Sequence, residues 1–433
     1  MESSGEQDAH LLVAHLFRHQ AGRIVAALTR LFGSRYLDLA EDVVQDALVK
    51  ALQQWPFKGI PENPAGWLTL VAKNRALDLL RRDSSLELKV AELERSLTQS
   101  SPVADNSSEG EMDDQLALIL MCSHPALAIE GQVALTLRSA CGFSTAEIAR
   151  AFLTPEATIA QRLVRAKRQI REQGIVIDPP NTKLIPERLD GVLRVIYLLF
   201  NEGYGATRGN ELVRADLCGE AIRLCTLLLH HGLRVPAVHA LLALMLLQAA
   251  RLPARTQDDG TLAILAKQDR SMWDQRLIAG GLRHLAWSAA GDTLTVYHLQ
   301  AEIAAFHATA KSDADTEWAG IAALYDQLHQ LEPTPIVALN RAIAKSRSEG
   351  PRAGIRALEE IDSHPALRHY HLLSAVRAEL WKQIGDFQRA ADAYRAALAC
   401  PCTEPERRFL ESQLQLIDTD DSSLGIDSSR LDL

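Results

Sequence analysis

The most informative stretch of the sequence runs from Ser144 to Arg171 and reads STAEIARAFLTPEATIAQRLVRAKRQIR. Its first seven residues predict a short helix with a Ser or Thr N-cap, and Glu147 completes a capping box. Residues 152–155 predict a tight turn, because Pro155 suits the first turn of a new helix. The stretch therefore predicts two helices joined by a sharp turn.

The second of these helices is expected over residues 156–168. Ala149 of the first helix would pack against Ile159 and Leu163 of the second, which are four residues apart and so lie on one face. Four polar and basic residues then face outward: Thr158, Gln161, Arg162 and Arg165. This pattern predicts a helix-turn-helix whose second helix fits the DNA major groove.

The charge of the chain is unevenly distributed. Residues 151–175 hold five basic and two acidic residues, whereas the whole chain of 433 residues has a net charge of −9. A protein that coats nucleic acid indiscriminately would be basic throughout. DNA binding is therefore expected to be local.

The N-terminal block, residues 10–82, also reads as helices. A helix over residues 37–55 has a buried stripe and a polar face that we expect to be exposed to solvent. A loop over residues 56–64 contains prolines, and a helix over residues 65–82 carries Lys and Arg. A basic helix beside a loop with Pro, Asn and aromatic residues suits single-stranded DNA, whose bases stack while cations hold its phosphates.

The rest of the chain divides at composition changes. Residues 99–114 contain five acidic residues and no Lys or Arg, which predicts a flexible linker. Pro179 and Pro180 predict a second break. Beyond it, Ala378, Gly385, Ala344 and Gly350 belong to a degenerate helical repeat with a period of about 34 residues, as in tetratricopeptide units.

The expected fold is all-α, because aromatic residues make up only 5% of a chain rich in Ala and Leu. We expect the following organisation: an N-terminal domain at residues 1–95, an acidic flexible linker at 96–118, a helix-turn-helix domain at 119–178, a helical extension at 185–290, tetratricopeptide-like repeats at 291–416 and a disordered tail at 417–433.

In order and spacing, these motifs resemble extracytoplasmic-function sigma factors of the sigma-70 family. Residues 38–51 (DLAEDVVQDALVKA) resemble region 2.2, and residues 67–82 (WLTLVAKNRALDLLRR) resemble regions 2.3–2.4. The helix-turn-helix resembles region 4.2. Residues 195–204, 217–224 and 268–274 resemble the C-terminal extension of a subgroup with a tetratricopeptide-like domain. In the helix-turn-helix, Ala160 and Gln161 occupy two positions that are often Lys and Ser in this family. The resemblance therefore does not specify which −35 sequence this chain recognises.

The resemblance implies a protein that binds core RNA polymerase and promoter DNA. It assigns docking on the β′ clamp helices to Asp38, Glu41, Asp42, Gln45 and Asp46. It assigns the −10 element to Trp67, Lys73, Asn74, Arg75, Asp78, Arg81 and Arg82. It assigns the −35 element to Thr158, Gln161, Arg162, Arg165, Lys167 and Arg168. The polymerase β flap is a further expected partner, and the extension is expected to regulate activity in cis and to bind a protein or peptide.

An alternative is a helix-turn-helix regulator with a tetratricopeptide sensor that does not join polymerase. We expect no enzyme, because no catalytic constellation stands out, and neither a cofactor nor a metal. Residues 203–209 lack the spacing of a phosphate-binding loop. The sequence shows neither a signal peptide nor a membrane span, so a cytoplasmic protein is expected.

Overall fold

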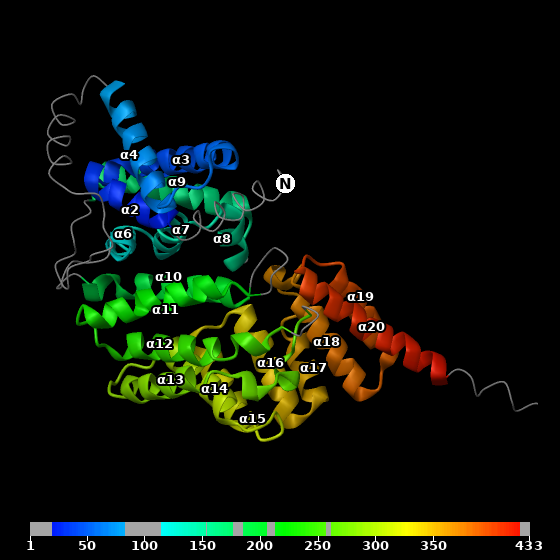
Figure 1. The fold of residues 1–433 in the computed structure, drawn as a ribbon. Coiled ribbons are helices and arrows are strands. Elements are labelled where there is room, and N and C mark those ends of the chain that lie inside the picture. The colour runs from blue at the N-terminus through cyan, green and yellow to red at the C-terminus, as the bar shows by residue number, and fades with distance from the viewer. Residues whose placement is uncertain are drawn as a thin grey trace, which may run out of the picture. The chain divides into compact units, whose positions relative to one another are not determined.

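The structure is a computed structural model, and it describes residues 20–82, 114–152, 154–175, 185–205, 213–256 and 261–424. Within these ranges it is helical, and its single strand-like feature is an isolated bridge between Thr256 and Leu262 (Figure 1). The expected all-α fold class is confirmed. The chain divides into two compact units, residues 1–195 and 196–433, and each is described by itself.

In its described residues, the first unit begins with three α-helices and one short 3-10 helix: α2 (Ala21–Phe32), η1 (Ser34–Tyr36), α3 (Leu37–Lys58) and α4 (Pro64–Arg82). Helix α3 packs against α2 and α4 and buries an apolar stripe that includes Val43, Val44 and Trp55. It runs three residues beyond its expected end, with Pro56 in its last turn. Proline removes one backbone donor but keeps a helical φ angle, so the helix continues.

The same unit contains a second group of helices: α6 (Asp114–Cys122), α7 (Ile129–Ser139), α8 (Thr145–Ala151) and α9 (Glu156–Gln173). Helix α6 is buried from Gln115 to its end, and it packs against α2 and α7. Asp114 is the first residue of α6 and pairs with Arg30 at 3.1 Å, although we predicted that it lies in the flexible linker. The other linker acids, Asp105, Glu109, Glu111 and Asp113, lie outside the described residues.

Helix α10 (Ile185–Tyr204) begins in the first unit and ends in the second. In its first half, Arg188 donates to the carbonyl of Leu120 at 3.0 Å. A Cβ atom on Gly191 would lie 2.5 Å from the side-chain oxygen of Gln132, so α10 lies close against α7 there. The start of α10 therefore completes the packing of the first unit.

The second unit continues with ten α-helices in the described residues: α11 (Ala215–His230), α12 (Pro236–Ala249), α13 (Gln275–Ser288), α14 (Val296–Thr309), α15 (Trp318–Leu331), α16 (Pro335–Glu349), α17 (Pro351–Glu359), α18 (His371–Ile384), α19 (Phe387–Leu398) and α20 (Glu404–Leu424). Short 3-10 helices connect some of them: η3 (Leu252–Ala254), η4 (Leu265–Lys267), η5 (Arg270–Met272) and η6 (Pro365–Leu367). From α11 on, successive α-helices pack against each other (Figure 1). Helix α20 extends eight residues beyond the expected start of the tail.

Two glycines of the C-terminal part, 35 residues apart in the sequence, each lie between two consecutive helices. Gly350, with φ of 95°, separates α16 from α17, and Gly385, with φ of 89°, separates α18 from α19. Both glycines adopt positive φ, which a residue with a Cβ atom rarely does. Ala344 and Ala378 are buried on the first helix of each pair, so the small residues mark close helix packing.

Within the residues that the structure describes, one apolar segment, Pro236–Ala254, is long enough to cross a membrane, but 61% of its most apolar 18-residue stretch is buried inside the protein. Helix α12, which forms the first 14 residues of this segment, contacts α11, α13 and α14. An apolar helix enclosed in this way is typical of a protein core.

Candidate nucleic-acid interface

A capping box fixes the start of α8. The backbone amide and hydroxyl of Ser144 donate to Glu147 Oε2 at 2.8 and 2.7 Å, and the amide of Glu147 donates to Ser144 Oγ at 3.2 Å. This reciprocal arrangement satisfies backbone donors that helix formation leaves open. The expected capping box is therefore present.

Helices α8 and α9 pack as the sequence predicts. Ala149, Ile159 and Leu163 are buried between the helices and α7. Gln161, Arg165 and Arg168 are exposed, and Thr158 is half-buried. The guanidinium of Arg162 lies 5.7 Å from the centre of the Phe152 ring, which supports that side chain from the turn. Helix α9 thus presents polar and basic groups on a surface beside the turn.

Helix α4 carries the second predicted group. Asn74, Arg75, Asp78 and Arg81 are exposed, whereas Trp67 and Lys73 are half-buried. The side chain of Arg82 lies outside the described residues. Arg75 pairs with Asp46 of α3 at 3.2 Å, and Asp78 pairs with Arg81 at 3.4 Å. Asp46, which is predicted to contact polymerase, is therefore paired with Arg75, which is predicted to contact DNA.

Apolar residues at the connection between α3 and α4 were missed from the sequence. Phe57 is 85% exposed and Ile60 is 44% exposed, although large apolar side chains are usually buried. Beside them, the rings of Trp55 and Trp67 pack edge to face at 5.4 Å. The loop composition was a signal for this site, but spacing alone did not show which apolar side chains would be exposed.

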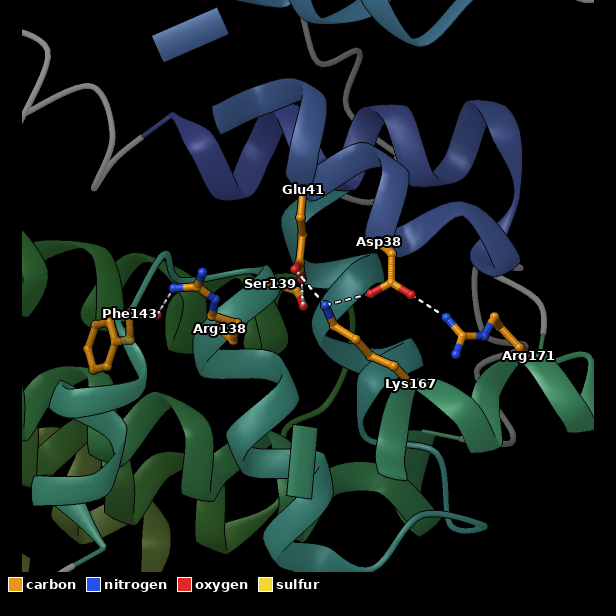
Figure 2. A network of polar contacts seen from close by, with 7 residues as sticks. All are labelled: Asp38, Glu41, Arg138, Ser139, Phe143, Lys167 and Arg171. Carbon is orange, nitrogen blue, oxygen red and sulfur yellow. Dashed lines mark hydrogen bonds and ion pairs between the residues drawn. The ribbon is translucent and has the colours of Figure 1, made fainter. Parts of the chain in front are cut away.

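The acidic face of α3 meets α9 in this structure (Figure 2). Lys167 Nζ lies 2.8 Å from Asp38 Oδ1 and 2.7 Å from Glu41 Oε2, and Arg171 pairs with Asp38. The hydroxyl of Ser139, at the end of α7, donates to the second oxygen of Glu41. We expected the α3 face to be exposed, but only 12% of the Glu41 side chain is exposed, because Lys167 and Ser139 cover it.

The ionisation of this cluster follows from its contacts. Burial lowers the pKa of the Lys167 ammonium, but the carboxylates of Glu41 and Asp38 outweigh burial and hold it above its usual value. Burial raises the pKa of Asp42; Lys167 opposes that shift, whereas Asp38, Glu41 and Asp46 add to it. Asp42, Gln45 and Asp46 themselves remain exposed.

No metal site appears in the described part of the chain: it holds no group of three or more His, Cys, Asp or Glu side chains suited to a metal ion. The six cysteines form no disulfide, and Cys122, Cys141, Cys218 and Cys225 are buried.

Comparisons with known families match three segments of the chain. Residues 16–85 match Sigma-70 region 2, residues 118–170 match Sigma-70, region 4, and residues 188–289 match a family of unknown function, DUF6596. An uncharacterized protein of Rhizobium meliloti (strain 1021) is 39% identical over 409 residues, which cover 94% of this chain and 96% of that protein. No solved structure matches.

Proposed function

Because this chain belongs to the sigma-70 family of RNA polymerase sigma factors, we propose that it is a cytoplasmic factor of the extracytoplasmic-function type. In this proposal it binds core polymerase, recognises the −10 and −35 promoter elements and starts transcription. One observation carries the proposal: the chain holds both a basic helix-turn-helix and an acidic helix α3. The helix-turn-helix lies in the segment that matches region 4, and α3 lies in the segment that matches region 2.

Helix α9 is the proposed reader of the −35 element. Its exposed Gln161, Arg165 and Arg168 can donate to base edges or phosphates, and Arg162 and Thr158 extend that surface. Recognition helices read the major groove through such side chains. Lys167 belongs to the predicted −35 set, but in this structure its ammonium is bound by carboxylates.

Helix α4 and the connection before it are the proposed −10 site. Exposed Phe57 and Ile60 offer apolar surface to bases of a melted strand, and aromatic stacking contributes about 1–3 kcal/mol per base. Arg75, Arg81 and Asn74 are exposed on α4, where they can contact phosphates and bases. The predicted contacts of Trp67, Lys73, Asp78 and Arg82 complete this set.

Core polymerase is the proposed partner of α3. Asp42, Gln45 and Asp46 form an exposed polar surface next to Asp38 and Glu41, and this surface would dock on the β′ clamp helices. The β flap is the proposed partner of the region 4 half. No catalytic activity belongs to the proposal.

The second unit is the proposed regulator in cis, with a tetratricopeptide-like repeat that binds a protein or peptide. Its helix pairs, with glycine turns at Gly350 and Gly385, support that proposal, because repeat arrays present extended binding surfaces. A chain that ends at Gly205 retains α10, whose first half packs on region 4. We expect promoter output from that chain to differ from full-length output at equal protein level.

Polymerase binding separates this function from the alternative of a regulator that never joins polymerase. The full-length protein is expected to copurify with core polymerase and to support transcription in vitro. The double variant Asp42→Arg, Asp46→Arg should lose both properties. The variant Glu349→Arg, Glu359→Arg, on exposed positions of the second unit, is the matched control. Promoter binding without copurification would favour the alternative.

A further inference from the structure

The carboxylates of Asp38 and Glu41 are engaged from the region 4 side. Glu41 accepts Lys167 on one oxygen and Ser139 on the other, and Asp38 accepts Lys167 and Arg171. These partners lie on α7 and α9, whereas both carboxylates lie on α3 (Figure 2). The α3 surface expected to meet polymerase is thus partly covered within its own chain.

The contact is enclosed rather than superficial. The side chain of Lys167 is 17% exposed, although lysine is usually among the most exposed residue types. Charges that are shielded from water interact more strongly than exposed pairs, and removal of one partner leaves the other buried without compensation. Lys167 and Glu41 are therefore suited to hold α3 and α9 together.

We propose that the Asp38–Glu41 surface of α3 is a shared binding surface. In the free protein it binds Lys167, Ser139 and Arg171 of the same chain, and in the initiation complex it binds polymerase. The two partners exclude each other, because the same carboxylate oxygens accept both. Polymerase must displace α9 from α3, and this displacement also releases the Lys167 ammonium toward DNA. The inference rests on the proposed function for its second partner.

The test removes the ammonium and keeps an unbranched apolar side chain as far as the Cε atom. Lys167→Met in the full-length protein is compared with Lys345→Met, whose ammonium pairs with Asp326 in the second unit and whose side chain is 23% exposed. Hydrogen exchange in the free protein reports the contact, through amides of residues 37–44 and 129–141. Affinity for core polymerase without DNA reports the competition.

Lys167→Met should raise hydrogen exchange in both segments and tighten core binding by about threefold to tenfold, because the competing contact is lost. Lys345→Met should change neither measurement. Protected amides over residues 64–82 verify that the first unit remains folded. Unchanged exchange would overturn the contact, and raised exchange with unchanged or weaker core affinity would overturn the shared surface.

Charge exchange gives a second test that does not need polymerase. The test is made in an Asp38→Asn background, because Asp38 lies 2.8 Å from the Lys167 ammonium and would repel a carboxylate at residue 167. There, Glu41→Lys alone should raise hydrogen exchange in the same segments, and Glu41→Lys with Lys167→Glu should lower it again toward the level of Asp38→Asn. Failure of the double variant to restore protection would contradict an electrostatic contact. If the unmodified protein binds no polymerase, the proposed function fails, whereas the exchange result still decides whether the contact exists.

Discussion

Gly22 of α2 lies directly against the carbonyl group of Ala140, which follows α7. A Cβ atom on Gly22 would lie 1.9 Å from the carbonyl oxygen of Ala140. That oxygen also accepts a hydrogen bond from Gln115 at 3.0 Å, and Gln115 is buried on α6. The region 2 and region 4 parts of the first unit therefore meet through close backbone contact as well as through charge.

Gly22→Ala should loosen this contact, because the new methyl group meets backbone that cannot move aside easily. Overpacking of this kind costs about 1–3 kcal/mol. We expect a lower unfolding temperature and faster hydrogen exchange at residues 21–32 and 129–141. Gly131→Ala is the control, because its Cβ atom would meet only the Ala166 side chain, at 3.6 Å. Equal stability of Gly22→Ala and the unmodified protein would contradict the close approach.

The capping box should matter for DNA binding through the stability of α8. Ser144→Ala removes the hydroxyl that accepts from the amide of Glu147, and loss of an N-cap costs about 0.5–2 kcal/mol. Denaturant unfolding followed by circular dichroism measures that loss, and promoter binding should weaken with it. Glu147→Gln keeps an acceptor for Ser144 and should therefore lose less stability than Glu147→Ala. A Gln variant as destabilised as Glu147→Ala would contradict the hydrogen-bond explanation.

Arg165 is predicted to contact DNA from α9. Arg165→Ala should weaken promoter binding, and its salt dependence distinguishes two kinds of contact. Loss of a phosphate contact lowers affinity for all sequences and reduces the salt slope by about 1, whereas loss of a base contact costs about 1–3 kcal/mol and relaxes specificity at one position. Arg352→Ala, an exposed arginine in the second unit, is the control. Unaltered binding by Arg165→Ala at every salt concentration would remove Arg165 from the interface.

The local parts of the fold could be predicted from the sequence. Ser144, Glu147 and Pro155 lie within a few residues of the helix starts that they specify, so their signals do not depend on the rest of the fold. The buried stripe of α9 follows from helical spacing for the same reason. The spacing between Gly350 and Gly385 likewise shows in the sequence because each glycine ends a helix.

The contact between α3 and α9 could not be predicted in this way. Lys167 and Glu41 are 126 residues apart, and periodicity places Glu41 on the polar face of its helix. A polar face is exposed unless another part of the chain packs against it. Residue spacing within one helix does not show whether a distant segment does so. Ser139 and Arg171 were missed as partners for the same reason.

Glu406 at the start of α20 should make the second unit sensitive to acid. Burial raises its pKa, but contacts with His371 and hydrogen bonds from the amide and hydroxyl of Thr403, both 2.7 Å, outweigh burial and lower the pKa to about 2. A carboxyl group whose pKa is lowered on folding contributes stability above its unfolded pKa and loses it as the pH falls.

This contribution should therefore be complete above the usual value of 4.5 and should decline as the pH falls toward about 2. Glu406→Gln should lower the unfolding temperature at neutral pH and should flatten its decline in that range. Glu411→Gln, further along the same helix at an exposed position, is the control. A pH dependence of unfolding that is the same for Glu406→Gln and the unmodified protein would contradict the assignment.

The ion pair between Glu202 and Arg214 should be a sensitive point of the second unit. Arg214 Nη2 lies 2.5 Å from Glu202 Oε1, and the two side chains are 9% and 2% exposed. Arg214→Met leaves the carboxylate buried without its partner, which typically costs about 3–5 kcal/mol. Replacement of both residues, Arg214→Met with Glu202→Leu, removes the uncompensated charge and should recover most of the loss. Arg223→Met is the control, since its pair with Glu220 is more exposed and lies within one helix. Chemical denaturation of the unmodified protein, Arg214→Met, the double variant and Arg223→Met measures their free energies of unfolding. A double variant no more stable than Arg214→Met would show that lost packing, rather than unpaired charge, causes the effect.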